Sequence, residues 1–171
     1  DDWSWFENPF VGTREFDGLR VMMALMNKWD LKQQNNAVYR VGDRELRYVV
    51  SDLGDTFGKT GGDWTRSKGD DEDYVGSKVI DKSTNREVDL VLDSRPPALY
   101  AVAVPYYVKR TKMEKVSEDI PRSHARWIGQ WLAQLSPGQI RDAFRAAGYA
   151  PRDVAAYSHK VSERIRQLNM L

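Results

Sequence analysis

Apolar residues recur at every third or fourth position in four segments of the chain, a spacing that predicts amphipathic helices. The first helix should begin near Thr13, whose side chain can cap it, carry Glu15 in its first turn, and end at Asn27. Its buried face is formed by Phe16, Leu19, Met22, Met23 and Met26.

The other three helices are predicted in the last third of the chain, from Ser123 onward. The second of these should open with a capping box at Ser136, have Pro137 in its first turn and stop at Gly148, and the third should begin at Pro151. Their apolar faces are Ala125, Ile128, Trp131, Leu132 and Leu135, then Ile140, Phe144 and Ala147, then Val154, Tyr157, Val161, Ile165 and Leu168.

Short β segments lie between these helical regions. Ala37–Val41 and Leu46–Ser51 are rich in β-branched and aromatic residues, and the Gly-Asp step between them predicts a hairpin. Weaker strands are expected at Lys78–Ile80, Val88–Leu92 and Leu99–Val104, with prolines between them. We therefore expect an α+β, helix-rich fold in one domain, 1–171, made of a patterned region (8–60), an irregular β-containing segment (61–122) and three helices (123–171).

Composition narrows the class of protein. With 41% hydrophobic and 30% charged residues, the 171-residue chain has the profile of a folded globular domain. A net charge of +1 gives no overall attraction for nucleic acid. The lack of cysteine excludes disulfides and thiol chemistry. No apolar stretch approaches the roughly 18 residues of a membrane span. The start at Asp1, without Met, suggests a processed product or a piece of a longer protein; the compartment stays open.

The hairpin brings candidate chemical groups together. If its loop is centred between Asp43 and Arg44, Asn35 faces Asp52; a tight Gly42-Asp43 turn would make them diagonal neighbours. In either register an amide oxygen and a carboxylate could share a hard cation such as Mg²⁺. Asp30 and Lys32 precede the same end of the hairpin, so we expect a polar cluster at this rim.

The same residues resemble two motifs of protein kinases. Asp30-Leu31-Lys32-Gln33-Gln34-Asn35 is similar to the D-L-K-x-x-N catalytic loop, and Asp52-Leu53-Gly54, after a short hairpin, is similar to the D-F-G metal-binding motif. The stretch from Asp52 to Lys59 also resembles secretory-pathway kinases of the Golgi casein-kinase type, and HipA-like and lipid-kinase-like proteins share this layout. The resemblance implies a kinase-like C-terminal lobe.

Each site residue takes a role from that resemblance. Asp30 would accept the proton of an attacking hydroxyl and Lys32 would neutralise the transferring phosphoryl group, so these two are the catalytic candidates. Asn35 and Asp52 would hold Mg²⁺, while Gly54 and Lys59 would lie beside ATP. The acceptor would be a hydroxyl of a protein or a small molecule.

Departures from the kinase pattern limit this expectation. Lys28-Trp29 stand where His-Arg usually precedes the catalytic Asp, and only 29 residues precede Asp30, too few for the N-terminal lobe that closes over ATP. The missing N-terminal lobe is thus an expected partner, and the chain alone should be inactive and bind ATP in the millimolar range or not at all. The alternative is a pseudokinase or a helical protein-interaction module without catalysis.

Other motifs are weaker. A P-loop needs four residues between its glycines, and Gly54 and Gly58 have three between them. Asp70–Asp73 is expected to be a solvated loop, and His124 and His159 have no partner spacing for zinc. The basic C-terminal third is expected to be a solvated face, and Trp3 and Trp5 either pack on the domain or once covered the absent lobe.

Overall fold

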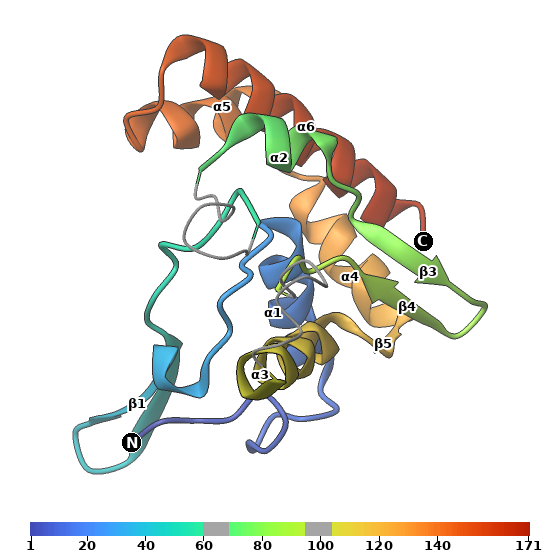
Figure 1. The fold of residues 1–171 in the computed structure, drawn as a ribbon. Helices are drawn as coiled ribbons and strands as arrows, with labels where there is room; N and C mark the ends of the chain where they lie inside the picture. The colour runs from blue at the N-terminus through green and yellow to red at the C-terminus, as the bar shows by residue number, and fades with distance from the viewer. Residues whose placement is uncertain (60–68, 95–103) are drawn as a thin grey trace.

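The computed structural model describes residues 1–59, 69–94 and 104–171, which form an α+β fold with about half of these residues in helices (Figure 1). Two small antiparallel sheets accompany the helices, one of order β1-β2 and one of order β3-β4-β5. The helices are α1 (Arg14–Leu25), α2 (Asp71–Gly76), α3 (Val104–Glu114), α4 (Arg122–Leu132), α5 (Pro137–Ala146) and α6 (Pro151–Asn169), and the strands are β1 (Asn36–Val41), β2 (Glu45–Val50), β3 (Ile80–Ser83), β4 (Glu87–Leu90) and β5 (Ile120–Pro121).

The capping signals of the sequence mark real helix ends. Thr13 caps α1 by accepting a hydrogen bond from the backbone N–H of Phe16, and α5 opens with the predicted capping box of Ser136 and Gln139. Gly148, with φ +84°, follows α5, and Pro151 opens α6. The predicted first helix and the last two helices are therefore confirmed.

Helix α4 forms as expected, and Ala125, Ile128 and Leu132 of its predicted face lie in or against the core. Trp131 and Leu135, predicted to be buried, have 57% and 44% of their surface exposed. The residues buried along α4 are Ala125 and Gly129. A Cβ atom at Gly129 would lie 2.7 Å from the backbone of Leu168 and Asn169, so α4 meets the end of α6 through a small residue. Ala147 of the α5 face is also exposed.

The middle of the chain differs most from expectation. Strands β3 and β4 lie close to two of the weak predictions, whereas residues 99–103 of the third lie outside the described residues. Val104–Glu114 is a helix, although only irregular β structure was expected here. The β-branched and aromatic residues at its start favour a strand, whereas Pro105 is compatible with the first turn of a helix. Asp70–Asp73 is not a loop: Asp70 caps α2, whose N-terminus favours the carboxylates that follow.

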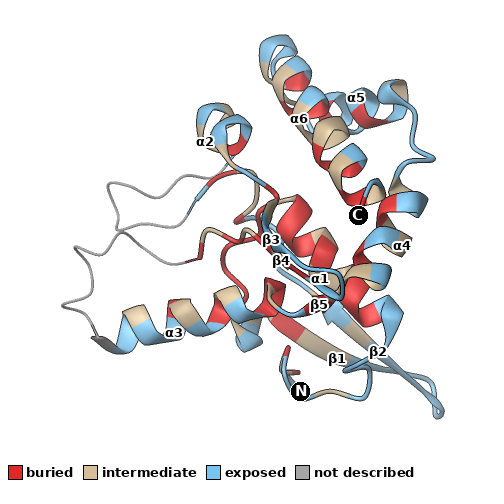
Figure 2. Ribbon diagram, turned by 90° about the vertical axis from the view of Figure 1, so that its right-hand side faces the viewer, coloured by how far each residue is buried: buried red, intermediate tan, exposed pale blue. Residues whose placement is uncertain are grey.

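Two hydrophobic clusters lie on different sides of α1. One joins α1 to α4, α5 and α6 and contains an aromatic group of Phe57, Tyr74, Phe144, Tyr149 and Tyr157. The other contains Trp3, Trp5, Phe16, Leu31 and Met113, so both N-terminal tryptophans pack on the domain. Figure 2 shows buried residues along α1 and the inner sides of α4 and α6, while the β1–β2 hairpin extends to an exposed tip. In the described parts of the chain, no helix is long and apolar enough to cross a membrane.

Candidate functional site

The loop after α1 is fixed by Asn27. This residue has a positive φ of 47°, a conformation that ends helices and that asparagine tolerates. Its buried side chain donates to the carbonyl of Gly58 and to Asp93 and accepts the backbone N–H of Asp93 at 3.0 Å. One side chain thus ties the start of the predicted catalytic loop to two segments that come later in the sequence.

Asp30 lies at the centre of a buried charge cluster. Its carboxylate accepts hydrogen bonds from Arg110 of α3 at 2.7 Å and from Lys32 at 2.7 Å, one to each oxygen, and only 4% of the residue is exposed. Burial raises the pKa of Asp30, but the hydrogen bond from Lys32 and the charges of Arg110, Lys32 and Lys28 outweigh burial, and the pKa falls below its usual 3.8. Asp30 is therefore held ionised.

Asn35 is joined to Asp30 through its amide. It lies in the short 3₁₀ helix Gln33–Asn35, and its Nδ2 donates to the backbone carbonyl of Asp30 at 3.1 Å and to the carboxylate at 3.5 Å. Its Oδ1 receives no hydrogen bond from the described residues. The structure thus brings together Asp30, Lys32 and Asn35, and leaves one amide oxygen available for a cation or a donor.

The hairpin register differs from both expected alternatives. Val41 pairs with Glu45 across a three-residue loop in which Gly42 has φ +61°, and the pairing continues to Asn36 and Val50. Asn35 is then opposite Ser51, and the backbone N–H of Ser51 donates to the backbone carbonyl of Asn35 at 2.8 Å. Because neighbouring residues of a strand point to opposite faces, Asp52 is not the directly facing partner of Asn35, and the predicted register is wrong.

Asp52 follows the hairpin as an exposed residue. Its Oδ1 accepts the backbone N–H of Gly54 at 2.9 Å, whereas no described residue donates to Oδ2. Gly54 does not adopt a left-handed conformation; its Cβ position would lie 3.3 Å from Asp52 Oδ1. The lack of a side chain at Gly54 therefore leaves space for the Asp52 carboxylate to accept this backbone hydrogen bond, and no unusual φ angle is needed.

Lys28 connects the two halves of the predicted site electrostatically. It is fully buried, its Nζ lies 3.9 Å from the carboxylate of Asp55, and it makes no hydrogen bond to a described residue. Burial lowers the pKa of Lys28, and the charges of Asp55, Asp52 and Asp30 oppose that effect. Lys28 therefore lies in the field of carboxylates from both predicted motifs, at the place where kinases usually have histidine or arginine.

Lys59 is placed elsewhere. Its ammonium pairs with Asp73 of α2 at 2.5 Å, and that hydrogen bond raises the pKa of Lys59. The charges of Asp73, Asp70 and Asp93 raise the pKa of Lys59 further.

Several residues of the cluster carry no motif in the sequence. Arg110 pairs with Asp30 across 80 positions of the chain, and Asp93 meets Asn27 across 66. Asp55 comes directly after the Asp52-Leu53-Gly54 motif but belongs to neither kinase-like motif, so the sequence predicted no role for it. The sequence held one indirect signal for Arg110. A buried carboxylate such as that of Asp30 needs a cationic partner, which can come from a distant part of the chain.

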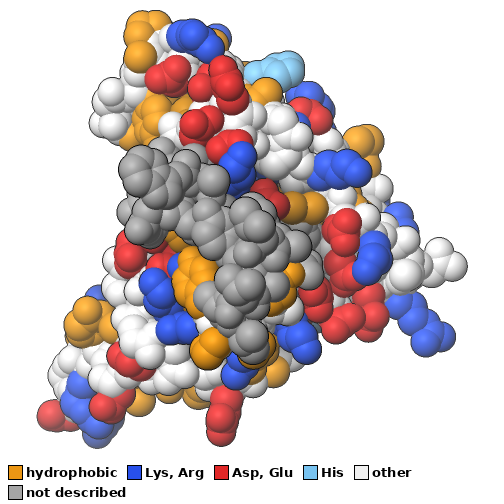
Figure 3. All heavy atoms as spheres, in the orientation of Figure 1, with side chains coloured by type: hydrophobic (Ala, Val, Ile, Leu, Met, Phe, Trp, Pro, Cys, Tyr) orange, Lys and Arg blue, Asp and Glu red, His pale blue; other side chains and the backbone are white. Residues whose placement is uncertain are grey.

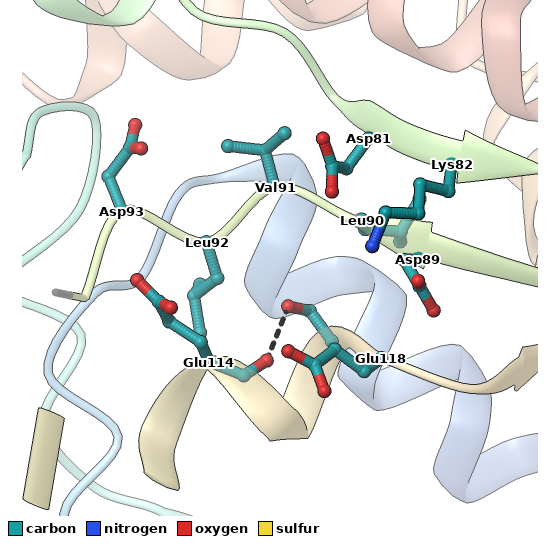
Figure 4. Close-up of a pocket in the computed structure, with 10 residues that line it drawn as sticks. Asp81, Lys82, Asp89, Leu90, Val91, Leu92, Asp93, Glu114 and Glu118 are labelled. Atoms are coloured by element: carbon teal, nitrogen blue, oxygen red, sulfur yellow. Dashed lines mark hydrogen bonds between the residues drawn. The ribbon is translucent and has the colours of Figure 1, made fainter. Parts of the chain in front are cut away.

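A separate pocket of about 210 Å³ lies between the β3–β4 sheet and the end of α3. Figure 4 shows Asp81, Asp89 and Asp93 on one side of it and Glu114 and Glu118 on the other. None of the six predicted site residues lines this pocket. Within the described ranges, no group of three or more His, Cys, Asp or Glu side chains is arranged to hold a metal ion.

The Asp30 cluster offers hydroxyl chemistry. An ionised carboxylate beside an ammonium can orient a hydroxyl and accept its proton, and amide and carboxylate oxygens such as those of Asn35 and Asp52 are of the type that Mg²⁺ prefers. Comparison with protein-family models, with curated proteins and with solved structures finds no match to this chain.

Proposed function

We propose that this chain carries the catalytic half of an ATP- and Mg²⁺-dependent phosphotransferase that acts on a hydroxyl group. The observation that carries the proposal is the joint geometry of Asp30, Lys32 and Asn35: a buried ionised carboxylate, an ammonium 2.7 Å from it, and an amide that binds the carbonyl of Asp30 while its oxygen stays available. These are the residue types that phosphoryl transfer uses for the acceptor, the transferring group and the metal.

Each residue has a distinct task in this proposal. Asp30 orients the acceptor hydroxyl and takes its proton, and Lys32 stabilises negative charge beside it. Asn35 and Asp52 are the residues that would hold Mg²⁺, with Lys28 balancing the carboxylates around them. Bound ATP supplies the phosphoryl group, and Gly54 leaves room for the Asp52 turn. Lys59 has no part here, since it is paired with α2.

The proposal requires a second structural element that covers the nucleotide from the other side of the cleft. Positioning from both sides of a cleft supplies much of the rate of phosphoryl transfer. We therefore expect a lobe or partner outside these 171 residues to complete the site. Without such an element, the same fold would serve as a pseudokinase or an interaction module.

Mg²⁺-dependent ATP binding tests the proposal in the complete gene product. We expect calorimetry to show binding that requires Mg²⁺ and that Asp52→Asn weakens by about tenfold or more, because a metal ligand is lost. Asp43→Asn, in the exposed hairpin loop, is the matched control and should bind as the parent does. ATP binding that ignores both Mg²⁺ and Asp52→Asn would refute the proposed site, and partner binding without ATP turnover would support the interaction module.

A further inference from the structure

A second pocket, of about 230 Å³, adjoins the Asp30 cluster. It is formed by the N-terminal segment, the loop after Leu31 and the exposed side of α3. The residues lining it are Ser4, Trp5, Phe6, Leu31, Lys32, Gln33, Gln34, Lys109, Lys112 and Met113. Lys32 belongs both to this pocket and to the ion pair with Asp30, so the pocket is continuous with the proposed catalytic residues.

The charge of this lining is positive. Lys32, Lys109 and Lys112 contribute ammonium groups, and none of the described residues that line the pocket is an Asp or Glu. Lys109 and Lys112 are exposed, lie one turn apart on α3, and form no ion pair with a described residue. On the face drawn in Figure 3, Lys and Arg side chains flank hydrophobic side chains near α3, whereas Asp and Glu gather over β3 and β4.

The other groups of the lining favour a small organic ligand. Lys112 lies over the ring of Phe6, with 5.4 Å between Nζ and the ring centroid, and Leu31 and Met113 add apolar surface. Trp5, 5% exposed, has an indole N–H that finds no acceptor among the described residues. Cations, amide groups and apolar walls in one hollow suit a carbon skeleton that bears an anionic group.

We infer that this pocket binds the anionic group, a phosphate or a carboxylate, of a small hydroxylated molecule that is the phosphoryl acceptor. Its role as an acceptor site rests on the proposed function; its binding of anions does not. An anion between Lys32, Lys109 and Lys112 places the rest of the molecule next to Lys32 and hence toward Asp30. Lys109 and Lys112 can neutralise the charge of the ligand, because neither is paired with a carboxylate in the described parts of the chain, whereas Lys32 already pairs with Asp30.

Binding is tested on the chain with three probes: glucose 6-phosphate, inorganic phosphate and glucose. The indole N–H signal of Trp5 in a nitrogen–proton correlation spectrum, assigned through Trp5→Phe, reports occupation. We expect both phosphate compounds to shift that signal and glucose to leave it unchanged. Added salt should weaken the binding, because exposed lysines are screened.

The variants separate this pocket from general surface charge. Lys109→Gln/Lys112→Gln should weaken phosphate and glucose 6-phosphate binding by about tenfold or more, since hydrogen bonds from charged groups are lost. Lys78→Gln/Lys115→Gln makes the same change in net charge at exposed lysines outside the pocket and should bind as the parent does. Equal weakening in both double variants, or no shift with either phosphate compound, would overturn the inference.

The two proposals fail in different ways. Phosphate binding that depends on Lys109 and Lys112, in a complete gene product that forms no ADP with any acceptor, would contradict the proposed function and leave the anion pocket standing. ADP formation with glucose as fast as with glucose 6-phosphate, unchanged in Lys109→Gln/Lys112→Gln, would support phosphotransfer and overturn the acceptor pocket.

Discussion

Arg164 and Arg110 are both buried, but they lie in different regions of the molecule and bind different partners. Arg164 of α6 donates to the backbone carbonyls of Ala24, Leu25 and Lys78 and lies 4.1 Å from the ring of Tyr74. Arg110 of α3 also reaches a carbonyl, that of Trp29 at 3.5 Å, but its shortest hydrogen bond, 2.7 Å, goes to the carboxylate of Asp30. Arg164 ties the end of α1 to the segment before β3, whereas Arg110 helps Lys32 to keep the carboxyl group of Asp30 ionised.

The difference separates a structural region from a candidate reactive one. In the helical region, Arg164 binds backbone carbonyls and lies over the ring of Tyr74. The loop region around Arg110 holds Asp30 ionised, leaves oxygens of Asn35 and Asp52 without donors from the described residues, and opens to a basic pocket. Changes in the first region should therefore alter stability, and changes in the second should alter chemistry.

The largest loss of stability should come from Arg164→Met. The variant removes the hydrogen bonds from a buried guanidinium to the carbonyls of Ala24, Leu25 and Lys78, so we expect the free energy of unfolding to fall by about 3–5 kcal/mol. Denaturant titration measures this loss. Arg166→Met, an exposed arginine of the same helix, should change stability by less than about 0.5 kcal/mol, and an equal loss in both variants would break the comparison.

Gly129→Ala should lower the free energy of unfolding by about 1–3 kcal/mol, because the added methyl group overpacks the contact between α4 and α6. The new methyl group would lie 2.7 Å from the backbone of Leu168 and Asn169, and backbone atoms cannot rotate away. Gly138→Ala in α5 is the matched control, because its Cβ position meets only the Ser136 hydroxyl at 3.6 Å. Thermal unfolding of both variants distinguishes a tight helix contact from a general effect of glycine.

A smaller effect concerns the pH dependence of stability near Asp30. Its pKa is lower in the folded chain than the usual 3.8, so its ionisation contributes stability above about pH 4 that is lost as pH falls through the folded value. Asp30→Asn should therefore lose less stability than the parent between pH 6 and pH 3. Denaturant titrations at both pH values give the comparison, and an unchanged pH dependence in the variant would show that Asp30 does not titrate as described.

The smallest effect is expected for Trp131→Gln. Trp131 belongs to the apolar pattern of α4 yet is 57% exposed, so its loss should cost less than about 0.5 kcal/mol. Leu168→Ala, at a fully buried position, should cost about 2–5 kcal/mol. Chemical denaturation of the pair tests whether α4 packs through Gly129 or through its large residues.

The fold was predictable where local signals fix the ends of elements. Thr13, the Ser136 box and Pro151 each act on the backbone within a few residues, so their helices follow from the sequence. The α3 helix could not be predicted in the same way, because Tyr106, Tyr107 and Val108 favour strands locally and its helical state depends on contacts made elsewhere in the fold.

The candidate site was predictable only in part. The loop from Asp30 to Asn35 is compact, and its short spacing brings those residues together. The hairpin register depends on whether its loop has an even or odd number of residues, and the three-residue loop starting at Gly42 changed the partner of Asn35. Arg110 acts across 80 positions, a distance at which no local pattern carries information.

A kinetic double-mutant cycle on Asp30 and Asp52 tests the central claim most directly. ADP formation by the complete gene product with Mg²⁺ is measured for Asp30→Asn, Asp52→Asn and the double variant, with Asp43→Asn as the control and circular dichroism to verify folding. If the two carboxylates act as one phosphotransfer site, each single variant loses about 10²-fold or more and the double variant loses little further. Full activity in both folded single variants would contradict the account.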